Sequence, residues 1–511
     1  MKSTVIFLMI LCALFAGCHP QVAKRTLTQP ENIQTVDGKL PYLKAHLHNG
    51  DVYVFLKNWV VNPGQKTVSG QSLKLNAQRE FVQKSRISLA IDSVAIFETN
   101  QMHPAPAIGG LSLISGISAI MTGMCAANPK ACFGSCPTFY ASDSTSSKLQ
   151  AEGFSASITP ALEASDIDAL YHAHPDSRQF EITMKNEAIE THVVRHVDVL
   201  SVPRLKGNRV FSTPNGTFYQ TRQIIVPDHC FAPEGDCVEQ ITAFDGMERF
   251  SPTDSTDVAA KETLDIPFKT VPNGPLGLVI AARQTLLSTY IFYQGLSYLG
   301  TSAGAWMASL ERGDPVAWQG FHNLGNMLGG IEVQIKNPDG QWATVGEVTE
   351  AGPLATDIRV VPLLGLQTDS LTVRLRLTKG HYRIDHIALA TLGDEVHPIR
   401  LHPKQVRHFG QNDPVAKQAL LDSTQTLIAM PGDVYTLMYE LPRDFENHEL
   451  FLESRGYYIE WMRQEWLAEE NALYAAHMLL APDLALRLMA PKFKKVESQM
   501  EPIFWSSRYA H

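Results

Sequence analysis

The sequence lacks several motifs that identify common enzyme classes. It contains no H-E-x-x-H metal-binding motif, no phosphate-binding loop and no dinucleotide-binding glycine fingerprint. It also lacks a clustered basic face of the kind that binds nucleic acid, and its net charge is −9 with a pI of about 6.1. The sequence therefore predicts no cofactor and no nucleic-acid partner.

The amino-acid composition is not extreme either. Charged residues make up 19% of the chain and hydrophobic residues 44%, which is typical of a folded globular protein rather than a disordered one. The chain has 511 residues, more than one hydrophobic core usually organises. We therefore expect about two to four domains.

The N-terminus carries an export signal. Lys2 is followed by the apolar residues 5–15, a run too short to span a bilayer as a permanent helix. Leu14-Phe15-Ala16-Gly17-Cys18 then resembles a bacterial lipobox. The resemblance implies cleavage before Cys18 and lipidation of Cys18, with several acyl chains as a membrane anchor. The alternative is an ordinary signal peptide that is cut elsewhere.

The residues after Cys18 bear on localisation. In the lipoproteins that this signal resembles, an aspartate just after the lipidated cysteine retains the protein at the inner membrane, and His19-Pro20 is not that signal. Residues 21–26 also lack the acidic cluster that some such proteins use for surface export. The resemblance therefore implies the outer membrane, with the protein facing the periplasm rather than the cell surface.

The remaining cysteines suggest small disulfide loops, because cysteines of exported proteins are usually oxidised. Cys230 and Cys237 bracket a turn-rich loop and are predicted to form one disulfide. Cys132 and Cys136 can close a second loop if their Cα atoms come within about 7 Å. Cys125 is an alternative partner for either of these two. A reactive thiol or a zinc site is the other interpretation, but the spacing has no matching second pair.

Two groups of residues have the composition of metal ligands. His172 and His174 have the His-x-His spacing that places both side chains on one face of a strand, but no third ligand is evident. Asp228 and Asp236 belong to an acidic cluster around the second cysteine loop, where the EF-hand spacing is absent. The sequence therefore predicts no metal ion.

Short segments rich in branched and aromatic residues recur along most of the chain. We predict a fold that is mainly β with α, with several domains, antiparallel β-sandwich modules, buried apolar helices and a C-terminal helical region. The strands expected in residues 330–392 resemble those of galactose-binding-type jelly rolls.

Two uncharged runs, residues 104–128 and 285–310, are long enough to suggest membrane helices. Both contain glycine and serine, which make transfer into lipid less favourable and allow close packing of helices. We therefore expect two buried helices that pack against each other, neither of which crosses lipid.

The predicted organisation follows the chain from the signal to the C-terminus. Its parts are a signal peptide (1–17), a lipidated tether (18–39), an N-terminal β region (40–103), an apolar helix with a cysteine-rich stretch (104–150), a β domain (151–275), an apolar helix (276–312), a jelly-roll-like β-sandwich (313–405), and a strand followed by C-terminal helices (406–511).

Three sequence segments, residues 132–140, 153–155 and 186–192, resemble segments of uncharacterised bacterial envelope lipoproteins. The resemblance brings no activity with it. We therefore expect a lipid-anchored, non-enzymatic binding or assembly protein with a protein or glycan partner. The alternative is an envelope hydrolase that acts on glycan or peptide, with its site between β domains.

Overall fold

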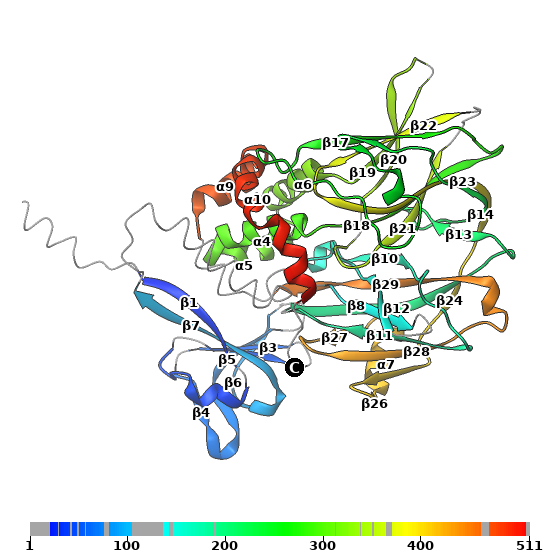
Figure 1. Cartoon of the computed structure of the whole chain (residues 1–511). Coiled ribbons are helices and arrows are strands. Elements are labelled where there is room, and N and C mark those ends of the chain that lie inside the picture. The colour runs from blue at the N-terminus through cyan, green and yellow to red at the C-terminus, as the bar shows by residue number, and fades with distance from the viewer. Residues whose placement is uncertain are drawn as a thin grey trace, which may run out of the picture. The chain divides into compact units, whose positions relative to one another are not determined.

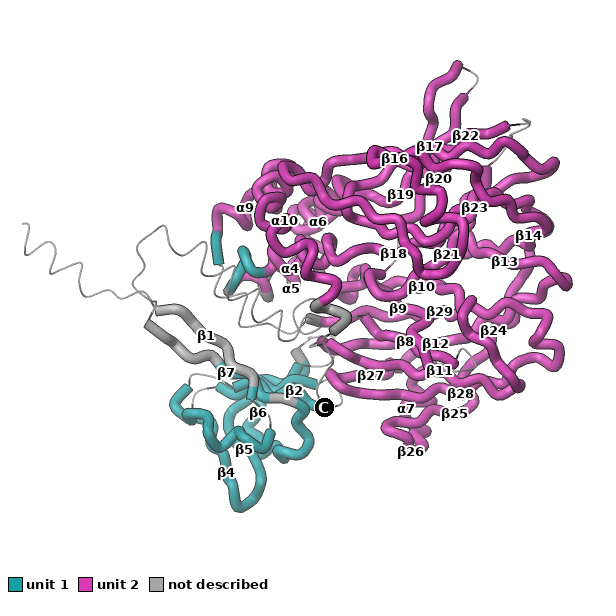
Figure 2. Tube along the Cα trace, viewed as in Figure 1, with its two compact units in different colours: residues 1–123, 297–301, 462–471 teal, residues 124–296, 302–461, 472–511 magenta. Residues whose placement is uncertain are grey.

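The computed structural model describes residues 21–28, 30–40, 43–48, 51–56, 58–75, 81–104, 136–142, 147–188, 190–311, 313–337, 339–349, 352–363, 370–460 and 470–506. The chain divides into two compact units, which Figure 2 shows in different colours. Unit 1 comprises residues 1–123, 297–301 and 462–471, and unit 2 comprises residues 124–296, 302–461 and 472–511.

Unit 1 contains an antiparallel sheet, as expected for residues 40–103. Its order is β1-β7-β2-β3-β5-β4, and β6 pairs with β5. The sheet also includes residues 21–28 as β1, which pairs with β7, so this part of the predicted tether (18–39) is a strand. Lys66 adopts a left-handed conformation with φ of 50° in the tight turn between β4 and β5. Trp59 is buried in the core of the unit. The strands are β1 (Gln21–Thr28), β2 (Leu43–Leu47), β3 (Val52–Phe55), β4 (Val60–Asn62), β5 (Thr67–Leu75), β6 (Phe81–Ala90) and β7 (Val94–Pro104).

Two sheets of unit 2 share one apolar core, to which Phe139, Ile182, Val197 and Leu437 contribute. One sheet has the order β26-β25-β28-β11-β8-β9, from β8 (Thr138–Ser142), β9 (Ser147–Glu152), β11 (Gln179–Lys185), β25 (Gln405–His408), β26 (Gln411–Asn412) and β28 (Val434–Glu440). The other has the order β10-β29-β12-β24, with β27 on β12, from β10 (Ala164–Ala169), β12 (Glu190–Pro203), β24 (Ile399–Leu401), β27 (Leu427–Ala429) and β29 (His448–Glu460).

The rest of the β structure in unit 2 is a closed barrel covered by a further sheet (Figure 1). The barrel order is β13-β14-β23-β18-β21, from β13 (Arg209–Ser212), β14 (Phe218–Ile225), β18 (Leu276–Gln284), β21 (Asp357–Leu363) and β23 (Tyr382–Val396). The covering sheet, called the outer sheet below, has the order β16-β15-β17-β22-β19-β20, from β15 (Phe231–Ala232), β16 (Gly235–Asp236), β17 (Lys261–Phe268), β19 (Ile331–Lys336), β20 (Trp342–Val348) and β22 (Leu371–Thr378).

The helical prediction for residues 276–312 is wrong at its start, because Leu276–Gln284 forms strand β18. Val279 and Ala281 pack in one apolar cluster, and Leu278 and Ile280 pack in another with the outer sheet. A strand buried on both faces shows no polar alternation, so a continuous apolar run does not distinguish it from a buried helix.

The helices of the described residues are α4 (Leu287–Leu299), α5 (Ala303–Glu311), α6 (Pro315–Leu328), α7 (Pro414–Leu421), α9 (Ala472–Leu480) and α10 (Pro482–Ser506). Helix α6 was not predicted within the β-sandwich of residues 313–405. It begins at Pro315 because the Asp314 carboxylate caps it by accepting hydrogen bonds from the N–H groups of Val316 (2.9 Å) and Ala317 (3.0 Å). Within the described ranges, no helix has the length and apolar character needed to cross a membrane.

The spacing of apolar residues from residue 455 onward also fits a helix, but residues 455–460 belong to strand β29. Tyr457 and Ile459 lie on β29, where they pair with Val193 and Thr191 of β12. Residues two apart match the period of a strand as well as a loose helical pattern, and pairing across the sheet decides between them. In the described part of the chain, the first helix after β29 is α9, which begins at residue 472, and residues 461–469 lie outside that part.

The predicted fold class, mainly β with several antiparallel sheets and a C-terminal helical region, is confirmed. The segment compared with a jelly roll supplies strands to two layers: β19, β20 and β22 to the outer sheet, and β21 and β23 to the barrel. Both layers also take strands from before residue 285. The predicted packing of the two uncharged runs stays a prediction, because residues 105–135 lie outside the described ranges.

Candidate functional site

The outward face of the outer sheet carries one row of side chains across five strands, which begins with Phe231 and continues with four polar residues. Phe231 of β15 lies opposite Asp265 of β17, which lies opposite Arg374 of β22. Arg374 in turn lies opposite Gln334 of β19, and Gln334 opposite Thr344 of β20. Directly opposed residues point to the same side of a sheet, so these five side chains share one face.

Charge-assisted hydrogen bonds hold this row in place. Arg374 binds Asp265 through two parallel bonds, with N–O distances of 2.6 and 2.8 Å. In the neighbouring row, Arg376 Nη1 lies 2.5 Å from Glu332 Oε1. The bidentate Arg374–Asp265 pair fixes the planes of both partners, so these two groups are oriented before any ligand arrives.

Aromatic rings lie at both ends of the row. At one end, Phe231 of β15, the strand next to the edge strand β16, is 53% exposed, and its ring stacks on His229 with ring centroids 5.4 Å apart. At the other end, on edge strand β20, the Trp342 ring has its centroid 4.1 Å from the Arg374 guanidinium. A polar row with an aromatic ring at each end can bind a ligand that has both hydroxyl groups and apolar faces.

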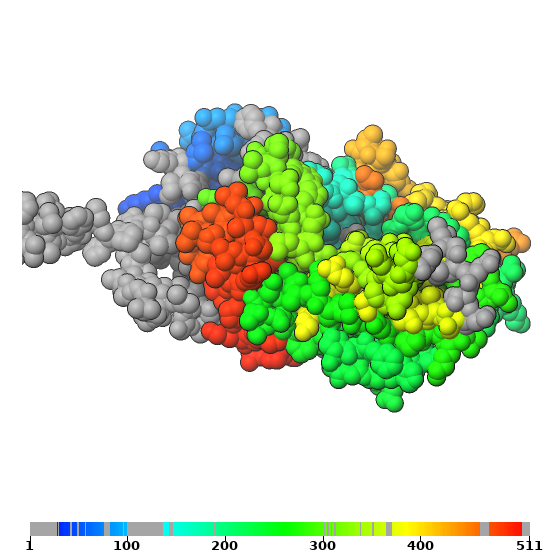
Figure 3. Space-filling view, turned by 90° about the horizontal axis from the view of Figure 1, so that it is seen from above, coloured from blue at the N-terminus to red at the C-terminus, as the bar shows by residue number. Residues whose placement is uncertain are grey.

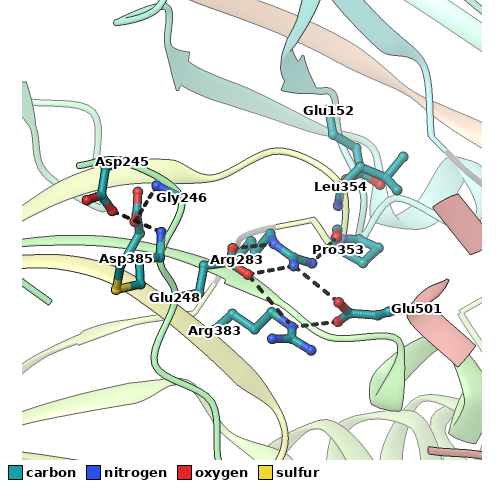
Figure 4. Close-up of polar contacts among 11 residues, drawn as sticks. Glu152, Asp245, Gly246, Glu248, Arg283, Pro353, Leu354, Arg383, Asp385 and Glu501 are labelled. Carbon is teal, nitrogen blue, oxygen red and sulfur yellow. Dashed lines mark hydrogen bonds and ion pairs between the residues drawn. The ribbon is translucent and has the colours of Figure 1, made fainter. Parts of the chain in front are cut away.

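A second cluster is ionic and lies where helix α10 meets the barrel (Figure 4). Arg283 at the end of β18 donates to Glu248 at 2.5 and 2.7 Å and to Glu501 of α10 at 3.2 Å. Arg383 of β23 donates to the other oxygen of Glu501 at 2.8 Å. Arg283 also donates to the carbonyl oxygen of Pro353 at 3.0 Å. The two arginines are thus neutralised within the chain, and the network holds α10 and the loop at Pro353 in place.

Asp385, on the same strand as Arg383, has an unusual environment. Its side chain is almost fully buried and accepts a hydrogen bond of 2.9 Å from the Gly246 N–H (Figure 4). Burial, together with the nearby carboxylates of Glu248 and Asp245, raises the pKa of Asp385 from 3.8 to about 6, although the Gly246 hydrogen bond opposes this. Asp385 and Glu248 are two carboxyl groups in different surroundings. Enzymes use such pairs as a general acid and a general base.

We expect the free energy of unfolding to decrease as the pH rises from about 4 to about 6, because the folded protein holds the Asp385 proton more tightly than the unfolded chain does. The slope from this group approaches about 1.4 kcal/mol per pH unit in that window. Urea unfolding of wild type and Asp385→Asn across pH 4–7 measures it, since the variant should lose this slope. The exposed Asp176→Asn is the control, and an unchanged slope in Asp385→Asn would contradict the assignment.

A third cluster consists of buried carboxylates around Arg359. Asp166 and Asp168 lie on β10, and Asp357 lies on β21 two residues before Arg359. Burial, followed by the charges of Asp166 and Asp357, raises the pKa of Asp168 well above its ordinary value. Asp168 therefore favours its neutral form more than an ordinary aspartate does, which limits the charge that Arg359 has to balance.

Glu152 links the second and third clusters through one loop. Its Oε2 accepts a hydrogen bond of 2.8 Å from the Leu354 N–H, next to the Pro353 carbonyl that Arg283 binds. A Cβ atom at Gly352 would overlap the Glu152 carboxylate, so the close approach of this loop requires glycine there. The loop is therefore held from both sides by charged groups (Figure 4).

Parts of the three sequence segments that resemble envelope lipoproteins lie together in the fold. Thr138 and Tyr140 both donate to Glu187 Oε2, at 2.9 and 2.7 Å, and the Lys185 ammonium lies 4.5 Å from the centroid of the Tyr140 ring. The Gly153 N–H donates to the Pro137 carbonyl at 3.0 Å. Burial, followed by the Glu187 charge, raises the pKa of Tyr140, so the phenol remains a hydrogen-bond donor.

The predicted cysteine sites divide between the described ranges and the rest of the chain. Cys230 and Cys237 are buried, with their Sγ atoms 2.7 Å apart, and they flank the hairpin of β15 and β16. Cys136 is buried next to Ile158 and Tyr458. Cys18 and Cys132, like Cys125, lie outside the described residues, so the pairing of Cys136 stays a prediction.

We expect Cys230 and Cys237 to form a disulfide in the exported protein. Closing this short loop should stabilise the fold by about 2–3 kcal/mol, so Cys237→Ser should lower the midpoint of denaturant unfolding. Peptide mapping without reductant should recover the linked pair, and reduction of the wild type should reproduce most of the loss seen in the variant. Two freely alkylated thiols in native material would contradict the prediction.

The residues considered as metal ligands have other roles in the structure. His172 and His174 lie in a turn after β10 rather than on a strand, and His172 stacks on Phe244 at 4.6 Å. The Asp228 carboxylate accepts a hydrogen bond from the Lys269 N–H at 2.8 Å. The Asp236 carboxylate accepts one from the Cys230 N–H at 2.9 Å. In the described part of the chain, no three histidine, cysteine, aspartate or glutamate side chains are arranged to hold a metal ion.

Sequence reasoning missed the ionic cluster, although one signal was present. Arg383 and Asp385 lie two residues apart at the start of β23, just before its apolar residues 387–390, so the strand carries two charges close together next to its apolar centre. It also passed over the G-x-S-x-G spacing of residues 300–304. That motif makes a nucleophile elbow where a strand turns into a helix, whereas here helix α4 precedes it, so the spacing identifies no nucleophile.

Comparison with known proteins identifies no family. No protein-family model and no curated protein matches the chain. A solved structure described as BuGH86wt in complex with neoagarooctaose is similar over 45% of this chain and 34% of that chain, with 8% sequence identity and a TM-score of 0.16. A likeness at this TM-score carries no argument about fold or function.

Proposed function

We propose that the chain is a lipid-anchored protein of the bacterial outer membrane that faces the periplasm and binds a glycan without modifying it. The anchor rests on the lipobox-like residues that end at Cys18. The proposal of a glycan partner is based on the outer sheet, where Phe231 and Trp342 flank the polar row of Asp265, Arg374 and Gln334.

The chemistry of the outer sheet favours a sugar over other ligands. Each pyranose ring has an apolar C–H face that stacks on an aromatic ring, and hydroxyl groups around its rim that exchange hydrogen bonds. Arginine and the carboxylates in fixed bidentate pairs can hold two hydroxyls at once. The Arg374 guanidinium, fixed by Asp265 and by the Trp342 ring, is the central group of this proposed site.

Glycan binding is tested by affinity electrophoresis of the mature chain against a panel of soluble neutral and acidic polysaccharides. We expect retention by at least one polymer and a loss of affinity of about tenfold in Trp342→Ala and in Phe231→Ala, since stacked aromatic rings carry much of such binding. Phe409→Ala is the matched control, because Phe409 is 60% exposed but lies away from the outer sheet. Unretarded migration with every polymer, or an equal loss in the control, would overturn the proposal.

A hydrolase is the second candidate, and the environment of Asp385 favours it. A carboxyl group with a pKa of about 6 near Glu248, which is paired with Arg283, could supply a general acid and a partner carboxylate for cleavage of a glycosidic bond. Release of reducing ends from a polymer that the chain binds, abolished in Glu248→Gln, would establish this alternative. Binding without release leaves the non-enzymatic function in place.

The anchor is tested separately by replacing Cys18. In Cys18→Ser we expect a precursor that retains its signal sequence and takes up no labelled fatty acid, because the serine hydroxyl does not replace the thiol that forms the thioether. Metabolic labelling and envelope fractionation measure both effects, with Cys136→Ser as the control. Normal processing and membrane retention of Cys18→Ser would rule out lipidation at this residue.

A further inference from the structure

Helices α9 and α10 form a hairpin that turns at Ala481-Pro482 (Figure 1). The Lys492 ammonium of α10 lies 4.7 Å from the centroid of the Tyr474 ring of α9, which is possible only if the two helices fold back on each other. Each helix buries one face: Ala475 and Met478 on α9, and Ala485, Leu486, Met489 and Phe493 on α10. The opposite faces of both helices are therefore turned away from the core.

Four leucines of the hairpin are exposed, where solvated helices usually carry polar residues. Leu473, at the start of α9, is 64% exposed, and the other three lie at and after the turn. Leu480, at the turn, is 76% exposed, and Leu484 and Leu488 are 41% and 38% exposed. Residues four apart lie on the same side of a helix, so Leu484 and Leu488 form one stripe that begins near Leu480. We name these three residues the leucine face. Exposed apolar patches of this kind mark contact sites.

Basic residues accompany the leucine face. Arg487 lies between Leu484 and Leu488, its side chain is 64% exposed, and it makes a long ion pair of 3.6 Å with Asp257. Lys495 is exposed two turns further along the same helix. The exposed Asp483 lies in the first turn of α10, where the helix dipole stabilises a negative charge. Beyond that first turn, the exposed side of the helix combines leucines with positive charges.

This combination matches the surface of an anionic bilayer. Amphipathic helices bind there by burying leucines at the level of the acyl chains while arginine and lysine contact the anionic headgroups. Protein interfaces are instead usually centred on tryptophan, tyrosine or arginine anchors in pockets. The leucine face has no aromatic anchor, and the space-filling view shows the hairpin (orange to red) at the surface of the molecule (Figure 3).

We infer that the leucine face of the α9–α10 hairpin inserts into the interface of an anionic membrane. This contact does not depend on the acyl chains predicted at Cys18 or on the proposed glycan site. With an acyl anchor present, it would be a second point of attachment and would restrict the orientation of unit 2 on the membrane. Its occupant is lipid, and neither a second copy of the chain nor a protein groove is required.

The test is vesicle flotation of residues 19–511, which retain both units and lack the cysteine predicted to be lipidated. The probes are vesicles of phosphatidylethanolamine with phosphatidylglycerol, and vesicles of phosphatidylcholine alone. We expect the chain to float with the anionic vesicles, and binding to fall about tenfold or more in Leu480→Ser/Leu484→Ser. Leu205→Ser is the matched control, because Leu205 is 64% exposed but lies far from α10 in the sequence, beside β13.

The design separates the outcomes. Circular dichroism is expected to show that the double variant remains folded, since both leucines are exposed. Arg487→Gln/Lys495→Gln should reduce the preference for anionic vesicles. Equal flotation of wild type and the double variant would overturn the proposal. So would self-association in sedimentation that the double variant abolishes, because the face would then bind a second copy.

Discussion

Replacement of Arg249 by methionine should lower the free energy of unfolding by about 3–5 kcal/mol. Arg249 has no exposed surface, and its guanidinium binds Glu262 at 2.6 and 3.0 Å and Glu234 at 2.8 and 3.0 Å. Glu262 is itself only 4% exposed, so removal of the arginine leaves a buried carboxylate without its counter-charge. The backbone of Arg249 also pairs with Ile384 of β23, which places the charge against the barrel.

Glu234 supplies the control for this experiment, because its side chain is 46% exposed. Glu234→Gln should cost about 1 kcal/mol or less, since water can replace an exposed partner. Arg249→Met/Glu262→Gln should recover part of the loss, because it removes both buried charges. Guanidinium unfolding followed by circular dichroism measures all three. Equal destabilisation in Glu234→Gln and Arg249→Met would show that burial of Glu262 is not the cause.

Replacement of Gly380 by alanine should cost about 2–4 kcal/mol. Gly380 lies just before β23 with φ of +72°, a conformation that disfavours any side chain. An added Cβ would also lie 2.7 Å from the Thr253 backbone nitrogen, so one of the two backbone segments must move. The hydrogen bond of 2.7 Å from the Thr285 hydroxyl to the Gly380 carbonyl opposes such a shift.

Gly340 separates the two causes. Its φ is +77°, and a Cβ at this position would meet no atom within 4 Å. Gly340→Ala should therefore lower the free energy of unfolding only by the backbone strain, about 1–2 kcal/mol. The additional loss of stability in Gly380→Ala then measures the steric clash with Thr253. Thermal unfolding of both variants gives the comparison. If the two variants lose the same stability, the clash at Thr253 is relieved without cost.

The features predicted correctly from the sequence are those whose signal is local. Ile331–Lys336 and Leu371–Thr378 alternate between apolar and polar residues, and both are strands with that alternation in their burial. Asn215-Gly216 is a dipeptide typical of tight hairpin turns, and it lies in the turn between β13 and β14, where Gly216 has φ of 82°. In each case the property depends on residues that are neighbours along the chain, so the pattern is readable without knowing the fold.

The sites depend instead on residues that are distant in sequence. Arg283 and Glu501 are 218 positions apart, and their ion pair exists only because α10 lies against the end of β18. The row from Phe231 to Thr344 depends on the register of five strands, and a shift by one residue would turn its side chains into the core. No composition or spacing within a single segment contains that register.

The sequence alone determined that the chain is mainly β, where several strands and turns lie, and that its N-terminus resembles an export signal with a lipidation site. Only the tertiary structure decided that Leu276–Gln284 is a strand, because burial on both faces removes the alternation that identifies one. It also decided the pKa of Asp385, since the cost of a charge depends on the burial and the neighbouring carboxylates that the fold supplies. Local periodicity is a property of a segment, whereas burial and pairing are properties of the whole chain.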